Sequence, residues 1–381
     1  MPSFTISARV HRVAISVFFF ISGVIGSSWA SRVLSVKDKF HLSEGGLGLA
    51  LFAVPLGQVT GLPLSAWLIA RYGSRRIIIS AAIAFPLALM GLGLAPTPWM
   101  LGVNLYFYGL CANLLNIGIN TQAVAVERLY GRSIIASFHG IWSLASFGSG
   151  LMGGLFITAG FTPFGHFSLI AGFAIFTAAL TYKYVLAESV EPGSSRPAFA
   201  KPDKRILLLG LTAFCSMLCE GAVANWSGVY FKKILNAPVS LTILGYVAFM
   251  SMMSLGRFTG DRFITRFGIT LLLRGGGTLI CTGFVLIVTA SHIAMATIGF
   301  FLVGLGASCV VPMIYGLAGK SKTMQPSMAL TAVSTIGFLG FLIGPPVLGF
   351  IAQLSNLRWS FAFVACLGFC IMLLAGKIKE E

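Results

Sequence analysis

Long apolar stretches alternate with short polar turns along the whole chain. A helix that spans a bilayer needs about 20 apolar residues. Twelve stretches meet this length, at roughly 13–34, 46–70, 76–95, 99–127, 133–159, 164–186, 205–231, 240–264, 270–290, 293–318, 327–353 and 357–376. The pattern predicts an all-α membrane protein with 12 transmembrane helices.

The composition supports a membrane protein. Hydrophobic residues make up 57% of the chain and charged residues 9%, which excludes a disordered chain and is far from the soluble globular range. The net charge of +16 could indicate nucleic-acid binding. However, the basic residues lie singly or in pairs at the ends of apolar stretches, so we expect the lipid bilayer, and not nucleic acid, to be the partner.

The basic residues also predict an orientation. With the amino terminus inside, 20 Lys and Arg residues fall on the inner side and six on the outer side, the six being Arg32, Lys37, Lys39, Lys232, Lys233 and Arg358. Cytoplasmic loops are enriched in such residues, so both termini are expected in the cytoplasm. The first stretch is longer than the apolar region of a signal peptide, which favours a retained helix.

Two segments of the chain, 61–76 and 256–271, resemble each other. The matching residues lie 195 positions apart and are Gly61, Arg71 and Gly73 in the first segment and Gly256, Arg266 and Gly268 in the second. Two unrelated hairpins with similar turns are the alternative, but an offset of about half the chain favours a duplication. We predict two pseudo-symmetric six-helix halves, 1–186 and 205–381, joined by a cytoplasmic linker at 187–204.

The second segment, Gly256-Arg257-x-x-Gly260-Asp261-Arg262-x-x-x-Arg266-x-Gly268, resembles the loop signature of the major facilitator superfamily. The first segment departs from it, with Ala66 and Trp67 in place of the Asp-Arg pair. The resemblance implies the major facilitator fold and alternating access to a solute site between the halves. It also implies a cytoplasmic gate, for which the candidates are Arg71, Glu127, Arg128, Asp261, Arg262 and Arg266; of these, Glu127 is expected to pair with a basic residue such as Arg71.

Six stretches, at 28–32, 120–128, 139–144, 220–226, 256–262 and 344–349, resemble the fucose-permease-like branch of that superfamily. This resemblance covers nearly the whole chain. It implies a carrier of a small polar solute, with a sugar or a related metabolite as one candidate, in a bacterial inner membrane. The chain departs from the branch at Asn116 and Asn225, where members often have acids.

Ionisable groups inside spanning helices are costly and are candidates for function. Glu220, near the middle of the seventh stretch, is the only acid expected deep in the bilayer. A carboxyl group in apolar surroundings suits the uptake and release of a proton. His139 is a second candidate for proton coupling. The alternatives are a neutral Glu that only hydrogen-bonds another helix and a packed, neutral His.

The candidate substrate-binding residues are polar or aromatic side chains in spanning helices, namely Trp29, Arg32, Asn113, Asn116, Asn120, Trp142, Asn225 and Trp226. Residues 113, 116 and 120 share one helix face, which is typical of cavity lining, although helix–helix hydrogen bonding would give the same pattern. Arg32 could instead extend to the interface, and Trp226 could be an interfacial anchor.

Other activities are excluded or disfavoured. The chain has no Gly-x-x-x-x-Gly-Lys-Ser/Thr motif, so it does not bind ATP through a P-loop. Its 7 cysteines all lie in apolar stretches and predict neither a disulfide nor a metal site. We expect no enzyme activity and no cofactor, and a monomer that moves a small polar solute with protons. An exporter of drugs or amphipathic metabolites, favoured by 32 Phe residues, and a membrane sensor or scaffold remain alternatives.

Overall fold

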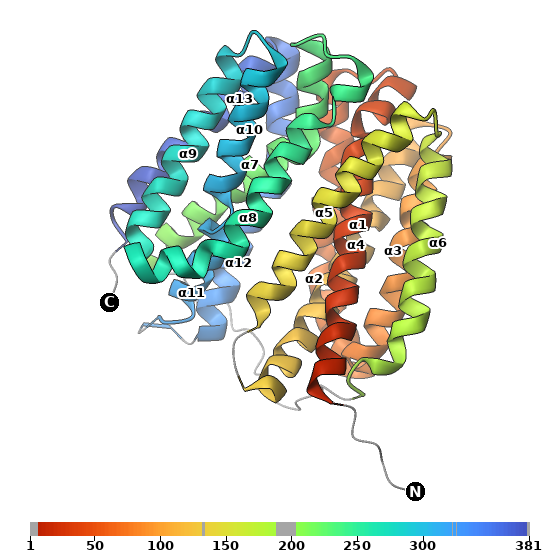
Figure 1. Ribbon diagram of the computed structural model, residues 1–381, viewed down its shortest axis with the longest axis vertical. Coiled ribbons are helices and arrows are strands. Elements are labelled where there is room, and N and C mark those ends of the chain that lie inside the picture. Colours follow the sequence, from red (N-terminus) through yellow and green to blue (C-terminus); the bar gives the residue numbers. More distant parts are fainter. Residues whose placement is uncertain (1–6, 132–133, 188–202, 322, 325, 379–381) are drawn as a thin grey trace, which may run out of the picture. The chain divides into compact units, whose positions relative to one another are not determined.

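The computed structural model describes residues 7–131, 134–187, 203–321, 323–324 and 326–378, and only the backbone of Ala136, Asp261, Pro326 and Ser327. Regular structure in these residues is helical throughout (Figure 1). The α-helices are α1 Ala8–Lys39, α2 Glu44–Tyr72, α3 Ser74–Leu94, α4 Pro98–Tyr130, α5 Ile135–Thr158, α6 Pro163–Thr181, α7 Lys204–Lys233, α8 Leu244–Phe267, α9 Ile269–Thr289, α10 Ile293–Ala307, α11 Val310–Ala318, α12 Pro326–Leu354 and α13 Leu357–Ala375. Short 3₁₀ turns cover Tyr182–Tyr184 and Val239–Leu241. Within the described residues, 12 segments are long and apolar enough to cross a membrane, which confirms the predicted number.

The chain forms two compact units. Unit 1 comprises Met1–Arg32 and Ala53–Ser194, and unit 2 comprises Val33–Phe52 and Ser195–Glu381. The segment Val33–Phe52 joins unit 2 through contacts such as the hydrogen bond from the Gly45 amide to Gln353 Oε1 (2.9 Å). Most of the predicted linker, at 188–202, lies outside the described residues.

Short turns between helices follow from local sequence. Thr97 and Thr162 cap α4 and α6 by accepting hydrogen bonds from the amides of Met100 and Gly165. Each is followed by proline, which fits the first turn of a helix because it has no amide hydrogen to leave unpaired. Both helices therefore begin directly after the threonine.

The duplicated turn is visible in the backbone. Gly73, between α2 and α3, has φ 82° and ψ 149°, and Gly268, between α8 and α9, has φ 78° and ψ 160°. Positive φ at such ψ is essentially restricted to glycine. The two glycines that match in sequence thus make the same turn, as the duplication predicts.

One predicted span is divided. The stretch 293–318 forms two helices, α10 and α11, with Ser308 and Cys309 between them. Helix α8 lies against this break: a Cβ on Gly256 would be 2.6 Å from Ser308 Cβ, and one on Gly260 would be 2.5 Å from Cys309 Sγ. Only glycine allows this approach of α8 to the break.

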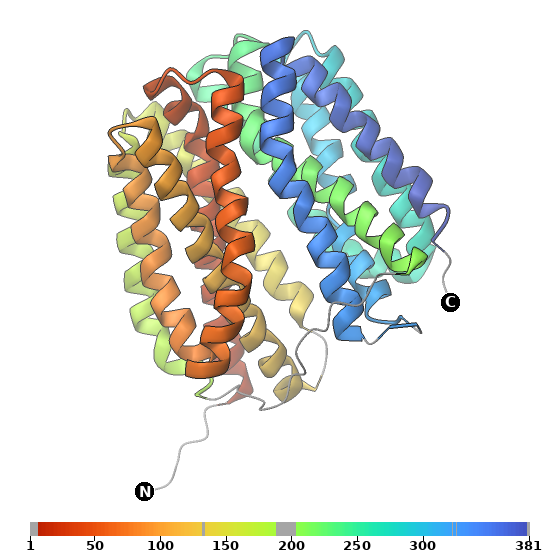
Figure 2. The ribbon, with the colours of Figure 1, turned by 180° about the vertical axis from the view of Figure 1, so that it is seen from behind.

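Helix α7 is the central helix of unit 2. It contacts α8, α10, α11, α12 and α13, and Figure 2 shows it (green) passing behind α12 and α13 (blue). Its aromatic residues Trp226 and Tyr230 are completely buried, and the Tyr230 ring packs 5.1 Å from that of Phe361. Polar groups in the middle of α7 therefore lie among other helices of the same unit.

Candidate functional site

The middle of α7 contains an acid that interacts with a base of α8. Glu220 is only partly exposed and interacts electrostatically with Arg257 of α8. Both residues lie inside membrane-spanning segments, Lys204–Lys233 and Val239–Gly260. Isolated charges are very costly there, and opposite charges in such segments pair with one another.

Two other helices of unit 2 add polar groups to this pair. The Tyr315 hydroxyl of α11 lies near Ser334 of α12 and interacts electrostatically with Glu220. Ser216, one turn before Glu220 on α7, is buried and interacts with the carboxyl group. Its hydroxyl group forms no hydrogen bond of normal geometry with a described residue. We name these five residues, Ser216, Glu220, Arg257, Tyr315 and Ser334, the Glu220 cluster.

The Glu220 cluster lies at the break between α10 and α11. Cys309 Sγ, in the break, donates a hydrogen bond to the carbonyl oxygen of Gly256 (3.4 Å), the residue that precedes Arg257. Cys309 also interacts electrostatically with Arg257 itself. Transporters commonly form their sites at interrupted helices, where backbone groups are free to bind solutes or ions.

The other two candidates on α7 follow Glu220 by about one and a half turns. Trp226 is fully buried, and its Nε1 atom has no hydrogen-bond partner among the described residues. Its surroundings are those of a packed core residue. Asn225 is half-buried, so its amide remains partly accessible.

Arg32 of α1 is buried in unit 1, with 3% of its surface exposed. Its Nε donates to Nδ1 of His166 (3.2 Å), and its Nη2 donates to the carbonyl oxygen of Phe161 (2.9 Å). Because Nδ1 accepts a hydrogen bond, His166 is neutral with its proton on Nε2. Arg32 therefore joins α1 to the beginning of α6. Nearby on α1, Trp29 is 5% exposed and lies 6.3 Å from the ring of Tyr108.

The asparagines of α4 have different surroundings. Asn113 is buried, and its Oδ1 accepts a hydrogen bond from Ser65 of α2 (2.7 Å), so it connects two helices of unit 1. Asn116 is exposed on unit 1, and Asn120 is half-buried and donates to the Asn116 carbonyl oxygen (2.8 Å). The last two have the accessibility that solute binding requires.

His139 and Trp142 lie where α5 crosses α1. The His139 ring is half-buried and contacts Phe19 edge-on, with ring centres 5.2 Å apart. A Cβ on Gly23 of α1 would lie 2.5 Å from the Trp142 carbonyl oxygen, so the two helices touch through their backbones. The Trp142 side chain is half-buried.

Among the gate candidates, Glu127 caps a helix. Its Oε2 accepts hydrogen bonds from the amides of Ile134 and Ile135 at the start of α5 (2.7 and 3.0 Å), in place of the expected pairing with Arg71. Arg71 is exposed and lies over the rings of Trp67 and Tyr72. The Glu127 carboxylate, at the start of α5, also interacts favourably with the dipole of that helix.

The remaining gate candidates are exposed cations and one acid. Arg128, Arg262 and Arg266 are exposed, and Arg266 lies 5.3 Å over the ring of Phe267. The side chain of Asp261 lies outside the described part of the structure. The role of this acid in the cytoplasmic gate therefore stays a prediction.

Comparison with known proteins adds the family. A family model described as Major Facilitator Superfamily matches residues 13–325 and 209–379. The chain belongs to the major facilitator superfamily. It is a multi-pass membrane protein, a secondary transporter of small molecules and not an enzyme.

Individual members of the superfamily are also similar. An uncharacterized MFS-type transporter of Yersinia pestis is 33% identical over 358 residues, with 94% of this chain and 93% of the relative covered. The membrane protein MosC of Rhizobium meliloti is 30% identical over 361 residues, with 93% and 87% covered. The crystal structure of a point mutant of the nucleoside transporter NupG superposes with a TM-score of 0.76 at 10% identity, covering 97% of this chain and 99% of NupG. This last similarity supports the fold.

Sequence reasoning missed most of the Glu220 cluster. The sequence indicates Arg257 only as part of the superfamily motif, and it gives no signal for Ser216, Tyr315 and Ser334. A basic residue in a spanning helix was the one available signal, because such a residue requires a partner inside the membrane. The sequence contained no sign that the partner was Glu220.

Proposed function

We propose that this protein is a proton-coupled transporter of a small polar solute and that Glu220 takes up and releases the proton. The main support is the interaction of Glu220 with Arg257 inside two spanning segments of unit 2. An acid in the middle of a spanning helix is expensive to keep unless it is used. Partial exposure of its side chain is compatible with access for protons from water.

Protonation would change the interactions of four helices. The ionised carboxylate attracts Arg257 and so favours contact between α7 and α8. Once neutral, Glu220 loses this attraction but can donate a hydrogen bond to a neighbouring oxygen. Tyr315 and Ser334 connect the same position to α11 and α12. Each proton would thereby change how α8 and α11 are held at the break beside Cys309.

The accessible amides of Asn116, Asn120 and Asn225 suit a solute with hydroxyl groups, because each amide offers both donors and an acceptor. A sugar or related metabolite has this chemistry. The finer assignment to the fucose-permease-like branch, near the inner-membrane transporter YbjJ, rests on the stretches described above. A monomer with both termini in the cytoplasm, and with Asp261, Arg262 and Arg266 forming its inner gate, belongs to the same proposal.

The test begins with a thermal-shift screen of purified protein against small solutes, which identifies a ligand. Proteoliposomes containing the wild type or Glu220→Gln then receive that solute with or without a pH gradient. We expect the wild type to accumulate solute under the gradient. Glu220→Gln should lose accumulation and keep equilibrium exchange, because glutamine resembles the neutral acid in shape and hydrogen bonding.

Asp38→Asn is a matched control, since Asp38 is an exposed acid at the end of α1. It should accumulate solute like the wild type. Glu220→Asp retains a titratable group and should restore part of the accumulation. Gradient-driven accumulation that persists in Glu220→Gln would refute the role of Glu220, and exchange without accumulation in the wild type would identify a facilitator. The sign of the gradient that drives movement separates import from export.

A further inference from the structure

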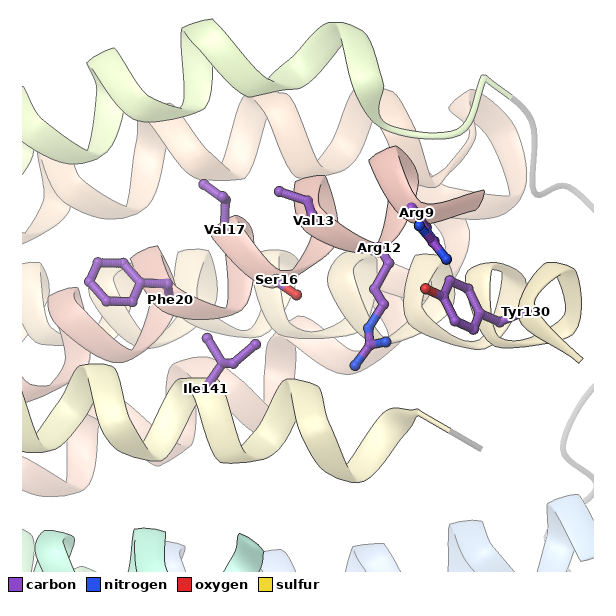
Figure 3. Close-up of a pocket in the computed structure, with 8 residues that line it drawn as sticks. All are labelled: Arg9, Arg12, Val13, Ser16, Val17, Phe20, Tyr130 and Ile141. Carbon is purple, nitrogen blue, oxygen red and sulfur yellow. The ribbon is translucent and has the colours of Figure 1, made fainter. Parts of the chain in front are cut away.

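A cavity of about 440 Å³ opens on the surface of unit 1, well away in sequence from the Glu220 cluster (Figure 3). Its lining comes from the first turns of α1, with one residue from the end of α4 and one from α5. One end is basic and the other is apolar. Among the residues that the structure describes, no acidic residue contributes to the lining.

The basic end is formed by Arg9 and Arg12, which Figure 3 shows beside Tyr130. Arg9 is exposed, and Arg12 is half-buried. The Arg12 guanidinium lies 5.2 Å over the Tyr130 ring, and its Nη2 donates a hydrogen bond to Ser137 Oγ (3.4 Å). These contacts orient one cation toward the cavity. The start of α1, at Ala8, adds the positive end of a helix dipole.

The apolar end is a groove along α1. Val13, Val17 and Phe20 follow at helical spacing on one face of the helix, with Ile141 of α5 opposite. Val13 is 63% exposed and Phe20 is 37% exposed, so the groove is open along the surface of a membrane-spanning unit. From Arg9 to Phe20 the helix rises about 16 Å. This length is close to the hydrocarbon thickness of one leaflet, about 15 Å.

We propose that this cavity binds an anionic phospholipid from the leaflet on the side of the amino terminus. Its phosphate lies between Arg9 and Arg12, and one acyl chain follows Val13, Val17 and Phe20. Basic pockets at the cytoplasmic ends of spanning helices favour anionic headgroups, because cations near the surface attract them through space. A free phosphate would contact only the basic end. A zwitterionic lipid would place the positive charge of its headgroup beside two arginines, which disfavours it.

Native mass spectrometry of the purified protein tests the headgroup. The probes are phosphatidylglycerol, phosphatidylcholine with identical acyl chains, and inorganic phosphate. We expect phosphatidylglycerol to bind more tightly than phosphatidylcholine. Arg9→Gln/Arg12→Gln should bind it about 25-fold more weakly, at roughly fivefold for each basic residue. Arg75→Gln/Arg76→Gln removes the same charge at the start of α3 and should bind like the wild type.

The acyl-chain half of the proposal has its own variant. Ser16 lines the cavity between the basic and apolar ends, so Ser16→Trp fills the groove and leaves both arginines in place. It should lose phosphatidylglycerol. Photo-crosslinking of the wild type with phosphatidylglycerol that has a diazirine in one acyl chain should label residues 13–20 or 141, and this needs no variant to fold. Equal binding of phosphatidylcholine, labelling elsewhere, or inorganic phosphate that displaces the lipid while Ser16→Trp binds normally would each overturn the proposal.

Discussion

Each unit contains an arginine inside a spanning helix, and the two differ in their partners. Arg32 of unit 1 is nearly inaccessible and donates to a neutral imidazole and a backbone carbonyl. Arg257 of unit 2 interacts electrostatically with the carboxyl group of Glu220. Both arrangements compensate a cation that the membrane would otherwise disfavour.

The difference lies in what a proton can change. The Phe161 carbonyl oxygen cannot be protonated, and His166 already accepts from the guanidinium at Nδ1, so the surroundings of Arg32 are fixed. Glu220 can be charged or neutral, and the attraction to Arg257 changes with it. We infer that the arginine of unit 1 maintains structure and that the arginine of unit 2 takes part in coupling.

Replacing each arginine by methionine should separate these roles. Arg32→Met leaves His166 Nδ1 and the Phe161 carbonyl without their donor, which should lower the free energy of unfolding by roughly 2–5 kcal/mol. Arg257→Met should cost less, because Glu220 can take up a proton and become neutral. It should nevertheless abolish gradient-driven accumulation.

Melting temperatures in detergent and solute accumulation in proteoliposomes measure the two effects. The comparison fails if Arg257→Met is the less stable variant, or if it accumulates solute normally while remaining folded.

A smaller substitution can be made beside each arginine, because a glycine there lies in close contact with another segment of the chain. A Cβ on Gly256 would be 2.6 Å from Ser308 Cβ in the helix break, and one on Gly153 would be 2.5 Å from Ser31 Cβ beside Arg32. Each Gly→Ala change should cost about 1–3 kcal/mol through overpacking. Only Gly256→Ala should also reduce transport beyond its effect on stability.

Second-site changes distinguish a local collision from a general loss of structure. Ser308→Gly should restore activity to Gly256→Ala, and Ser31→Gly should restore the melting temperature of Gly153→Ala. Lack of rescue by Ser308→Gly would show that the contact of α8 with the break does not limit transport.

The smallest expected effect concerns helix caps. Asp203 caps α7 by accepting from the Ile206 amide (2.8 Å), and a hydrogen bond donated by the Thr323 hydroxyl is the main cause that holds its pKa below the ordinary value. Thr162, a neutral cap, begins α6. Either residue changed to alanine should cost about 1 kcal/mol at pH 7.

Only the Asp203 effect should depend on pH. Because the folded carboxyl group has the lowered pKa, its stabilisation is complete above the pKa of an exposed Asp, about 3.9, and is lost as the pH falls through the folded value. The difference in melting temperature between the wild type and Asp203→Ala should therefore be smaller at pH 3 than at pH 7. The difference in melting temperature between the wild type and Thr162→Ala should be the same at both pH values. If the difference for Asp203→Ala were also the same at both pH values, this account of the cap would be contradicted.

The fold was largely predictable because its main signals are local. Apolar length determined the spans, and Gly73 and Gly268 marked the same turn twice. The break at Ser308 was not predictable, since residues 293–318 are apolar throughout and the interruption arises where α8 approaches at Gly256.

The site was predictable only in part for a related reason. Glu220 stands out as an acid in an apolar stretch, whereas its neighbours Arg257 and Tyr315 lie on other helices, whose packing the sequence pattern does not specify. Likewise, the sequence makes Arg32 a reasonable solute ligand, because nothing in it indicates that His166, far along the chain, lies beside this side chain.

The most direct test of the central claim is infrared difference spectroscopy of the carboxyl groups in lipid-reconstituted protein between acid and neutral pH. We predict a protonated-carboxyl band in the wild type that is absent in Glu220→Gln. Its pH dependence should change in Arg257→Met and remain that of the wild type in Arg32→Met. A band that persists in Glu220→Gln, or that responds equally to both arginine variants, would contradict the assignment of proton coupling to Glu220 and Arg257.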